Sequence, residues 1–273
     1  SPKFNILRKK QKDKNLRKLR TLLTHSKSLL FMMYIFSSVI NAETTREPVL
    51  TRNELSCLFS NGIPKHKIGK FPNKANPNKL VEQKLTFCFP TKPIFTGSIT
   101  RNLMTVGVSI SGIPFRPYTA EFYDNSSKRG FSDDPSSGWR KQAMHEPRKL
   151  GLDFNNGHVD KSGLYHYHKV SDNVLTGKNE TLLGFAPDGF KIFYSSLETS
   201  SWKLKNGTRS SPPGGNYDGT FEEDFEYIKG SGSLDECNGR KSNNEYSYFA
   251  TNSYPYLPRC FKGLVNTKFL QRK

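Results

Sequence analysis

The sequence predicts a mainly β protein, a single domain of antiparallel strands that form a β-sandwich or a barrel-like sheet. It also predicts long loops and at most one or two short helices. Helical periodicity is nearly absent from the chain, and short runs of β-branched and aromatic residues recur instead. Turn-forming residues separate these runs, as at Asn61-Gly62, Asn156-Gly157, 211–216 and Asp218-Gly219.

Five apolar runs are expected to be strands, at residues 85–90, 104–110, 183–186, 190–194 and 246–250. The run at 104–110 has the clearest alternation of small or polar and apolar residues, which fits a strand buried on one face. A single helix is expected at residues 139–150, and Pro147 limits its length.

Residues 157–168 are expected to form a tight β-hairpin that carries three of the six histidines. With residues 161–163 as its loop and Gly163 at positive φ, His158 lies directly opposite His166. His168 shares the face of His166, because side chains alternate along a strand. A four-residue loop would instead place His158 opposite Tyr165 and separate the three imidazoles.

These three imidazoles are a candidate site for Zn²⁺ or Cu²⁺, with His158, His166 and His168 as ligands. Three protein ligands leave a fourth position open, as in catalytic zinc sites. Asp188 and Asp160 are candidate fourth ligands or partners that orient the imidazoles, although the position of Asp188 before Gly189 favours capping of a turn. The alternative is that the histidines are half-buried sheet residues that bond to backbone or carboxylate groups.

The first 42 residues are expected to be a signal peptide with a long basic region. Residues 1–27 carry ten Lys or Arg and one Asp, and the uncharged run at 28–42 has 15 residues. A membrane span needs about 20 apolar residues, so cleavage after Ala42 is expected, with no stable span afterwards. The remaining chain then divides into a short leader at 43–55, a domain at 56–263 and a C-terminal tail at 264–273.

The charge of the chain after residue 42 indicates acidic partners. It has 32 basic and 23 acidic residues, which would attract acidic extracellular polymers or matrix proteins. Nucleic acid is not an expected partner, because the basic residues are scattered and no nucleic-acid-binding motif occurs. A solubilising surface without a specific partner is the simpler alternative.

The cysteines and glycosylation motifs fit an exported protein. Four cysteines predict two disulfides, and of the three possible connectivities we favour the one in which both disulfides close local loops. These pairs are Cys57–Cys88 and Cys237–Cys260. Three Asn-x-Ser/Thr motifs are candidate glycosylation acceptors, at Asn125, Asn179 and Asn206.

The hairpin contains the tetrapeptide Tyr165-His166-Tyr167-His168, and with it the sequence resembles the YHYH domain family. Further segments that resemble the family occur in the same order at residues 61–66, 71–73, 76–78, 112–115, 120–122, 157–158, 186–190, 217–221, 224, 234–240 and 258–263. The chain departs from the family pattern at Lys191, where the family usually has Pro. Both Cys237 and Cys260 lie in family motifs, which supports their pairing.

The resemblance implies an exported protein and assigns no activity. The sequence contains no nucleophile elbow, metalloprotease helix, phosphate-binding loop or calcium loop, so no catalytic residue is assigned. We therefore expect a secreted, non-catalytic structural or adhesive protein of an extracellular matrix, with a mineralised or skeletal matrix as one setting. The alternative is a metal-binding protein or metal-dependent hydrolase that uses the three histidines of the hairpin.

Overall fold

The structure is a computed structural model that describes residues 50–173 and 180–272. The expected signal peptide at 1–42, part of the leader and the glycosylation candidate Asn179 lie outside the described residues. The described residues form a compact unit that contains five sheets.

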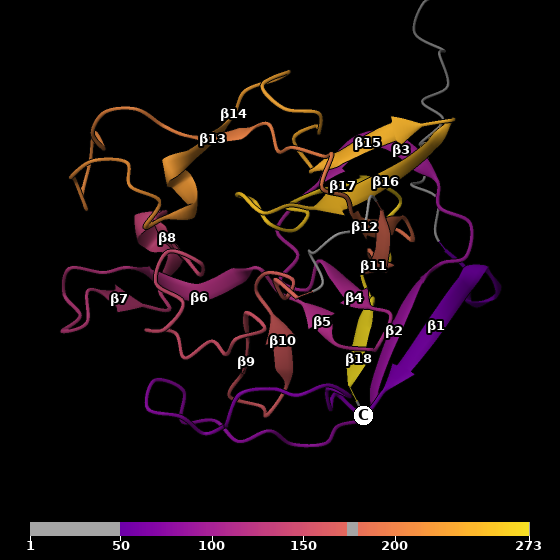
Figure 1. Ribbon diagram of the computed structural model, residues 1–273, viewed down its shortest axis with the longest axis horizontal. Coiled ribbons are helices and arrows are strands. Elements are labelled where there is room, and N and C mark those ends of the chain that lie inside the picture. The colour runs from indigo at the N-terminus through magenta and orange to yellow at the C-terminus, as the bar shows by residue number, and fades with distance from the viewer. Residues whose placement is uncertain (1–49, 174–179, 273) are drawn as a thin grey trace, which may run out of the picture. The chain divides into compact units, whose positions relative to one another are not determined.

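The largest sheet has eight strands and carries the histidine hairpin at one edge (Figure 1). Its strands lie in the order β15 (Gly239–Ser242), β16 (Glu245–Ala250), β12 (Lys191–Tyr194), β11 (Thr181–Phe185), β4 (Gly107–Ser109), β5 (Pro114–Phe115), β10 (Tyr165–Tyr167) and β9 (Gly157–Val159). The pairs β5–β10 and β12–β16 are parallel, and the other pairs of this sheet are antiparallel.

Four smaller sheets and three short 3₁₀ helices complete the described residues. One three-stranded sheet consists of β1 (Leu55–Ser60), β2 (Leu85–Pro90) and β18 (Leu270–Arg272). The other consists of β7 (Phe131–Ser132), β6 (Tyr118–Tyr123) and β8 (Arg140–Gln142). The two-stranded sheets are β17 (Phe261–Gly263) with β3 (Phe95–Thr100), and β13 (Trp202–Leu204) with β14 (Phe225–Tyr227). The 3₁₀ helices are η1 (Arg52–Glu54), η2 (Pro135–Ser137) and η3 (Glu222–Asp224).

The mainly β class is confirmed, since the strands are mostly antiparallel and the described residues contain no helix longer than three residues. None of the five sheets closes into a barrel. The run at 85–90 is β2 with the expected bounds, whereas only residues 107–109 of the run 104–110 pair as β4. Within the described segments, no helix has the length and apolar character needed to cross a bilayer.

The helix expected at 139–150 is wrong. Residues 140–142 form β8, which pairs with β6, and turns follow it. Extended backbone is favoured here because β8 buries Lys141 and Gln142 against its neighbours. The Gln142 side chain then accepts a hydrogen bond from the Met144 amide, which turns the chain away from a helical course.

The main core packs beneath β10, the strand that carries the tetrapeptide. Tyr165 is 0% exposed, and its hydroxyl donates hydrogen bonds of 3.0 and 2.9 Å to the two carboxylate oxygens of Asp153. The ring of Tyr165 lies over Gly157 on β9, where any Cβ would overlap it. The tyrosines therefore anchor the inner face of the hairpin and leave the histidines on the other face.

Two disulfides link the cysteine pairs that close local loops. Cys57 and Cys88 are directly opposite each other on β1 and β2, with Cα atoms 4.1 Å apart. Cys237 and Cys260 are both 0% exposed within the main core, with Cα atoms 4.8 Å apart.

Removal of either disulfide should destabilise the domain. The loops span 31 and 23 residues, and cross-links of that length stabilise by roughly 3–4 kcal/mol through restriction of the unfolded chain. We expect this loss for the Cys57→Ser/Cys88→Ser variant in urea unfolding, and a larger one for Cys237→Ser/Cys260→Ser because two buried hydroxyls are added. Unfolding midpoints equal to wild type in both variants would contradict the pairing, and peptide mapping without reductant checks it directly.

Candidate metal centre

The register of the β9–β10 hairpin determines which side chains meet. Gly163 has φ +84°, and its amide donates to the carbonyl of Asp160 at 2.9 Å, which closes a loop of residues 161–163. His166 then lies directly opposite His158. The register with the three-residue loop is confirmed, and the alternative with a four-residue loop is wrong.

The hairpin loop is held by one carboxylate. Asp160 accepts hydrogen bonds from the Ser162 amide at 2.8 Å and the Leu164 amide at 3.1 Å. Its other oxygen binds the guanidinium of Arg116 at 2.7 Å. Burial acts to raise the pKa of Asp160, but these hydrogen bonds outweigh it and lower the pKa. Asp160 therefore fixes the loop as an anion and does not hydrogen-bond an imidazole.

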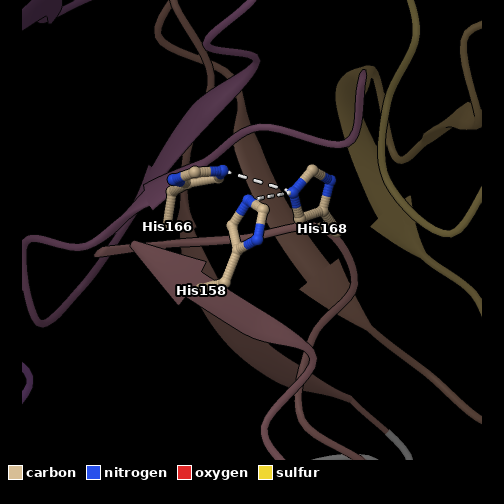
Figure 2. Close-up of side chains that lie close together, drawn as sticks. All are labelled: His158, His166 and His168. Atoms are coloured by element: carbon tan, nitrogen blue, oxygen red, sulfur yellow. Dashed lines mark hydrogen bonds between the residues drawn. The ribbon is translucent and has the colours of Figure 1, made fainter. Parts of the chain in front are cut away.

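The Nε2 atoms of the three histidines converge on one point (Figure 2). Nε2 of His168 lies 3.2 Å from Nε2 of His166 and 3.1 Å from Nε2 of His158. The candidate ligand atoms of all three residues lie within 4.8 Å of one another. Two nitrogen ligands at ~2.0–2.1 Å from a tetrahedral ion are about 3.3 Å apart, so the spacing around His168 is that of a zinc site.

The opposite nitrogen of each ring faces a backbone carbonyl. Nδ1 of His158 lies 2.9 Å from the oxygen of Leu150, Nδ1 of His166 lies 3.2 Å from that of Leu164, and Nδ1 of His168 lies 3.3 Å from that of Pro117. A carbonyl can only accept, so the proton of each neutral ring is assigned to Nδ1.

This tautomer leaves a lone pair on every Nε2, and three lone pairs then point at one another. Two unprotonated nitrogens at 3.1–3.2 Å have no proton to share. A cation at their centre would satisfy all three. Carbonyls that fix the distal nitrogen are also the usual outer partners of metal-bound histidines.

Burial keeps these rings neutral. His166 is 5% exposed and His168 is 2% exposed. Burial, followed by the repulsion that a charged ring would meet from the neighbouring histidines, holds the pKa of both rings well below its usual value. The pKa of His158 is lowered mainly by burial. A metal ion therefore meets unprotonated ligands across the neutral pH range.

The three histidines line an open groove of about 920 Å³. Its walls include the β5–β6 segment, the loop at 75–78 and residues 127–133. A volume of this size is within the range of small-molecule sites. The triad is therefore deeply set, and a ligand or water can still approach its open side.

Asp188 is not brought to the triad. It is 0% exposed, and one of its carboxylate oxygens accepts hydrogen bonds from the Tyr248 hydroxyl at 2.6 Å and the Gly263 amide at 3.0 Å. Its other oxygen accepts from the Phe190 amide. These contacts join the turn at Asp188 to β16 and β17. Both carboxylate oxygens are therefore engaged in hydrogen bonds within the core.

His66 and the glycosylation candidates of the described residues do not belong to the triad. His66 stacks on Tyr167 and its Nε2 lies 3.1 Å from the tyrosine hydroxyl, on the core face of β10. Asn125 and Asn206 are exposed, as glycan acceptors need to be, and their modification stays a prediction. The carbonyls of Leu150 and Pro117 could not be found from the sequence, because backbone groups leave no mark in a residue pattern.

Comparison with protein families identifies the relationship. The model described as YHYH protein matches residues 86–263, more than half of the chain. The chain belongs to the YHYH family. The matched region of this YHYH protein contains the hairpin and the Cys237–Cys260 disulfide, while Cys57 precedes it. Neither the curated proteins nor the solved structures contain a match.

The buried histidines predict that the metal-free YHYH protein loses stability in acid. Their folded pKa values lie below the unfolded value of about 6.5, so the unfolded state binds more protons as the pH falls below that value. We expect these two rings to lower the free energy of unfolding by roughly 1–3 kcal/mol per pH unit below pH 6.5, relative to a variant without them. Asp188 and Glu223 act in the opposite direction, because burial raises their pKa values to about 6 and about 7.

Urea unfolding of metal-free protein at pH 7.5, 6.5 and 5.5 measures this slope. His166→Gln/His168→Gln should flatten it, while His66→Gln, which changes a histidine on the other face, should keep it. An equal slope in wild type and the double variant would show that the two rings are not the source.

Proposed function

We propose that this YHYH protein is an extracellular metal-binding protein that holds one Zn²⁺ or Cu²⁺ ion through Nε2 of His158, His166 and His168. The observation that carries the proposal is that Nε2 of His168 lies 3.1–3.2 Å from Nε2 of both other rings while each Nδ1 faces a carbonyl. A polar network without an ion would need an imidazole proton between at least one of these pairs.

The ligand chemistry favours these two ions. Neutral imidazole suits zinc and copper, whereas calcium and magnesium select oxygen ligands. Among the described residues the cluster consists of three histidines and no carboxylate or thiolate. Such a set leaves an open position for water or for a small ligand from the groove.

Metal binding has stronger support than hydrolysis. A bound ion could lower the pKa of a water, but hydrolysis also benefits from a carboxylate that takes the proton. Two carboxylates of the groove, Asp160 and Glu121, already pair with arginines at 2.7 and 3.1 Å. We therefore place binding first and hydrolysis as a second use of the same centre.

An extracellular location is compatible with metal binding and with hydrolysis, and it is equally compatible with a structural role. The two disulfides are consistent with an oxidising compartment. A secreted matrix component that binds acidic polymers is the second candidate function, favoured by the excess of 32 basic over 23 acidic residues beyond residue 42. A mineralised or skeletal matrix is one setting for such a component.

Metal content decides the first candidate. We expect purified protein to bind about one equivalent of Zn²⁺ or Cu²⁺, with His166→Ala and His168→Ala each lowering affinity at least about a hundredfold, since even outer-shell changes cost 10- to 100-fold. Elemental analysis and competition with a chromophoric chelator measure this.

The matched control is His66→Ala, which removes an imidazole from the core face of β10. It should leave the metal affinity unchanged. Wild-type protein that binds no zinc or copper at micromolar concentrations would refute the proposed metal centre.

Retention on a sulfated polysaccharide tests the second candidate. We expect the protein lacking residues 1–42 to elute from immobilised heparin above physiological salt. Its excess of basic residues attracts sulfate groups, and charges in contact with the polymer are closer than the screening length of about 8 Å at that ionic strength. Elution at or below 0.15 M salt would count against acidic polymers as partners.

A further inference from the structure

The groove above the three histidines carries more positive than negative side chains. Its basic residues are Arg116, Arg129, Lys149, Lys161 and Arg272, and its acidic residues are Glu121, Asp133 and Asp160. A divalent ion in the proposed centre would add two further positive charges to this space. The groove is therefore suited to a ligand of opposite charge.

The ion pairs of the groove do not neutralise it. Asp160 is shared by two cations, Arg116 at 2.7 Å and Arg272 at 3.6 Å. Glu121 is likewise shared, by Arg129 at 3.1 Å and by Lys141 at 3.0 Å. Each carboxylate can balance only one of its two partners, so each cluster retains positive charge.

Arg116 is the cation of the groove best placed to act together with the histidines. It follows β5, the neighbour of β10, and its amide donates to the carbonyl of Tyr167 at 2.8 Å. Arg116 and all three histidines line the same groove. A ligand bound there can therefore meet both the guanidinium and the position where the ion would bind.

The guanidinium of Arg116 has donors to spare. Its Nη1 binds Asp160 at 2.7 Å, and its Nε donates to the Thr105 hydroxyl at 3.3 Å. In the described part of the chain, Nη2 has no hydrogen-bond partner. The side chain is only 19% exposed, so its carboxylate partner and the wall of the groove hold it in place.

We propose that the groove binds an oxyanion-bearing ligand of small-molecule size, with the oxyanion between the open metal position and Nη2 of Arg116. This inference rests on the proposed metal centre and names the ligand class that it takes. A phosphate or carboxylate oxygen is a good fourth ligand for zinc, and a guanidinium matches a second oxygen of the same group. The groove volume of about 920 Å³ accommodates more than an inorganic ion.

The test is titration of Zn²⁺-loaded protein with inorganic phosphate by isothermal titration calorimetry at constant ionic strength, with metal-free protein in parallel. We expect saturable binding to the loaded protein and at least tenfold weaker binding to the metal-free form. Arg116→Gln should weaken phosphate binding roughly tenfold or more, the usual effect of losing a charge-assisted hydrogen bond. It should also retain zinc at least as tightly as wild type, because a neighbouring cation has been removed.

Arg129→Gln is the matched control, since Arg129 lines the same groove but pairs with Glu121 and is 73% exposed. It should change phosphate affinity less than about twofold, the range of a screened surface charge. If Arg116→Gln proves unstable, Arg116→Lys preserves the charge and the ion pair with Asp160. It should still weaken phosphate binding, because an ammonium group lacks the planar set of donors with which a guanidinium binds two oxygens. Acetate in place of phosphate separates a carboxylate ligand from a phosphate ligand.

The outcomes separate the two proposals. Protein that binds no zinc refutes the metal centre and this inference together. Protein that binds zinc but neither phosphate nor acetate refutes the oxyanion site and leaves the metal centre intact. The same conclusion follows if the Arg116→Gln variant binds these anions as well as the Arg129→Gln control does.

Discussion

The register of one short hairpin is the constraint on which the rest of the site depends. A three-residue loop places His158 opposite His166, and a slip by one residue would turn His158 toward the core. Gly163 at φ +84° and the contacts of Asp160 with the loop amides select this register. On the other face, Tyr165 fits over Gly157 and opposes any slip. The buried tyrosines thus determine where the histidines point.

The charge state of the histidines follows from their surroundings. Burial in the sheet favours the neutral ring, and the carbonyls of Leu150 and Pro117 assign the proton to the nitrogen that faces away from the cluster. The same burial that would lower the stability of the metal-free protein in acid prepares the ligands for an ion. Stability and metal affinity are therefore coupled through protons.

The groove and the hairpin are joined through Arg116 and Asp160. Asp160 holds the hairpin loop with one oxygen and the Arg116 guanidinium with the other. The residue that sets the histidine register therefore also positions Arg116, which lines the groove together with the histidines. An oxyanion that binds Arg116 would act on the loop as well as on the metal, which links ligand binding to the order of the hairpin.

Sequence patterns predicted the strand at 85–90 and favoured both the local cysteine pairs and the hairpin register with three histidines on one face. Those features depend on neighbours close in the chain, where alternation and turn residues are informative. The patterns misassigned 139–150, because pairing of β8 with β6 overrides local helix preference. Only the tertiary structure removed Asp188 from the site and supplied the carbonyls of Leu150 and Pro117. Those contacts join segments distant in sequence, and a residue pattern contains no record of which segments meet.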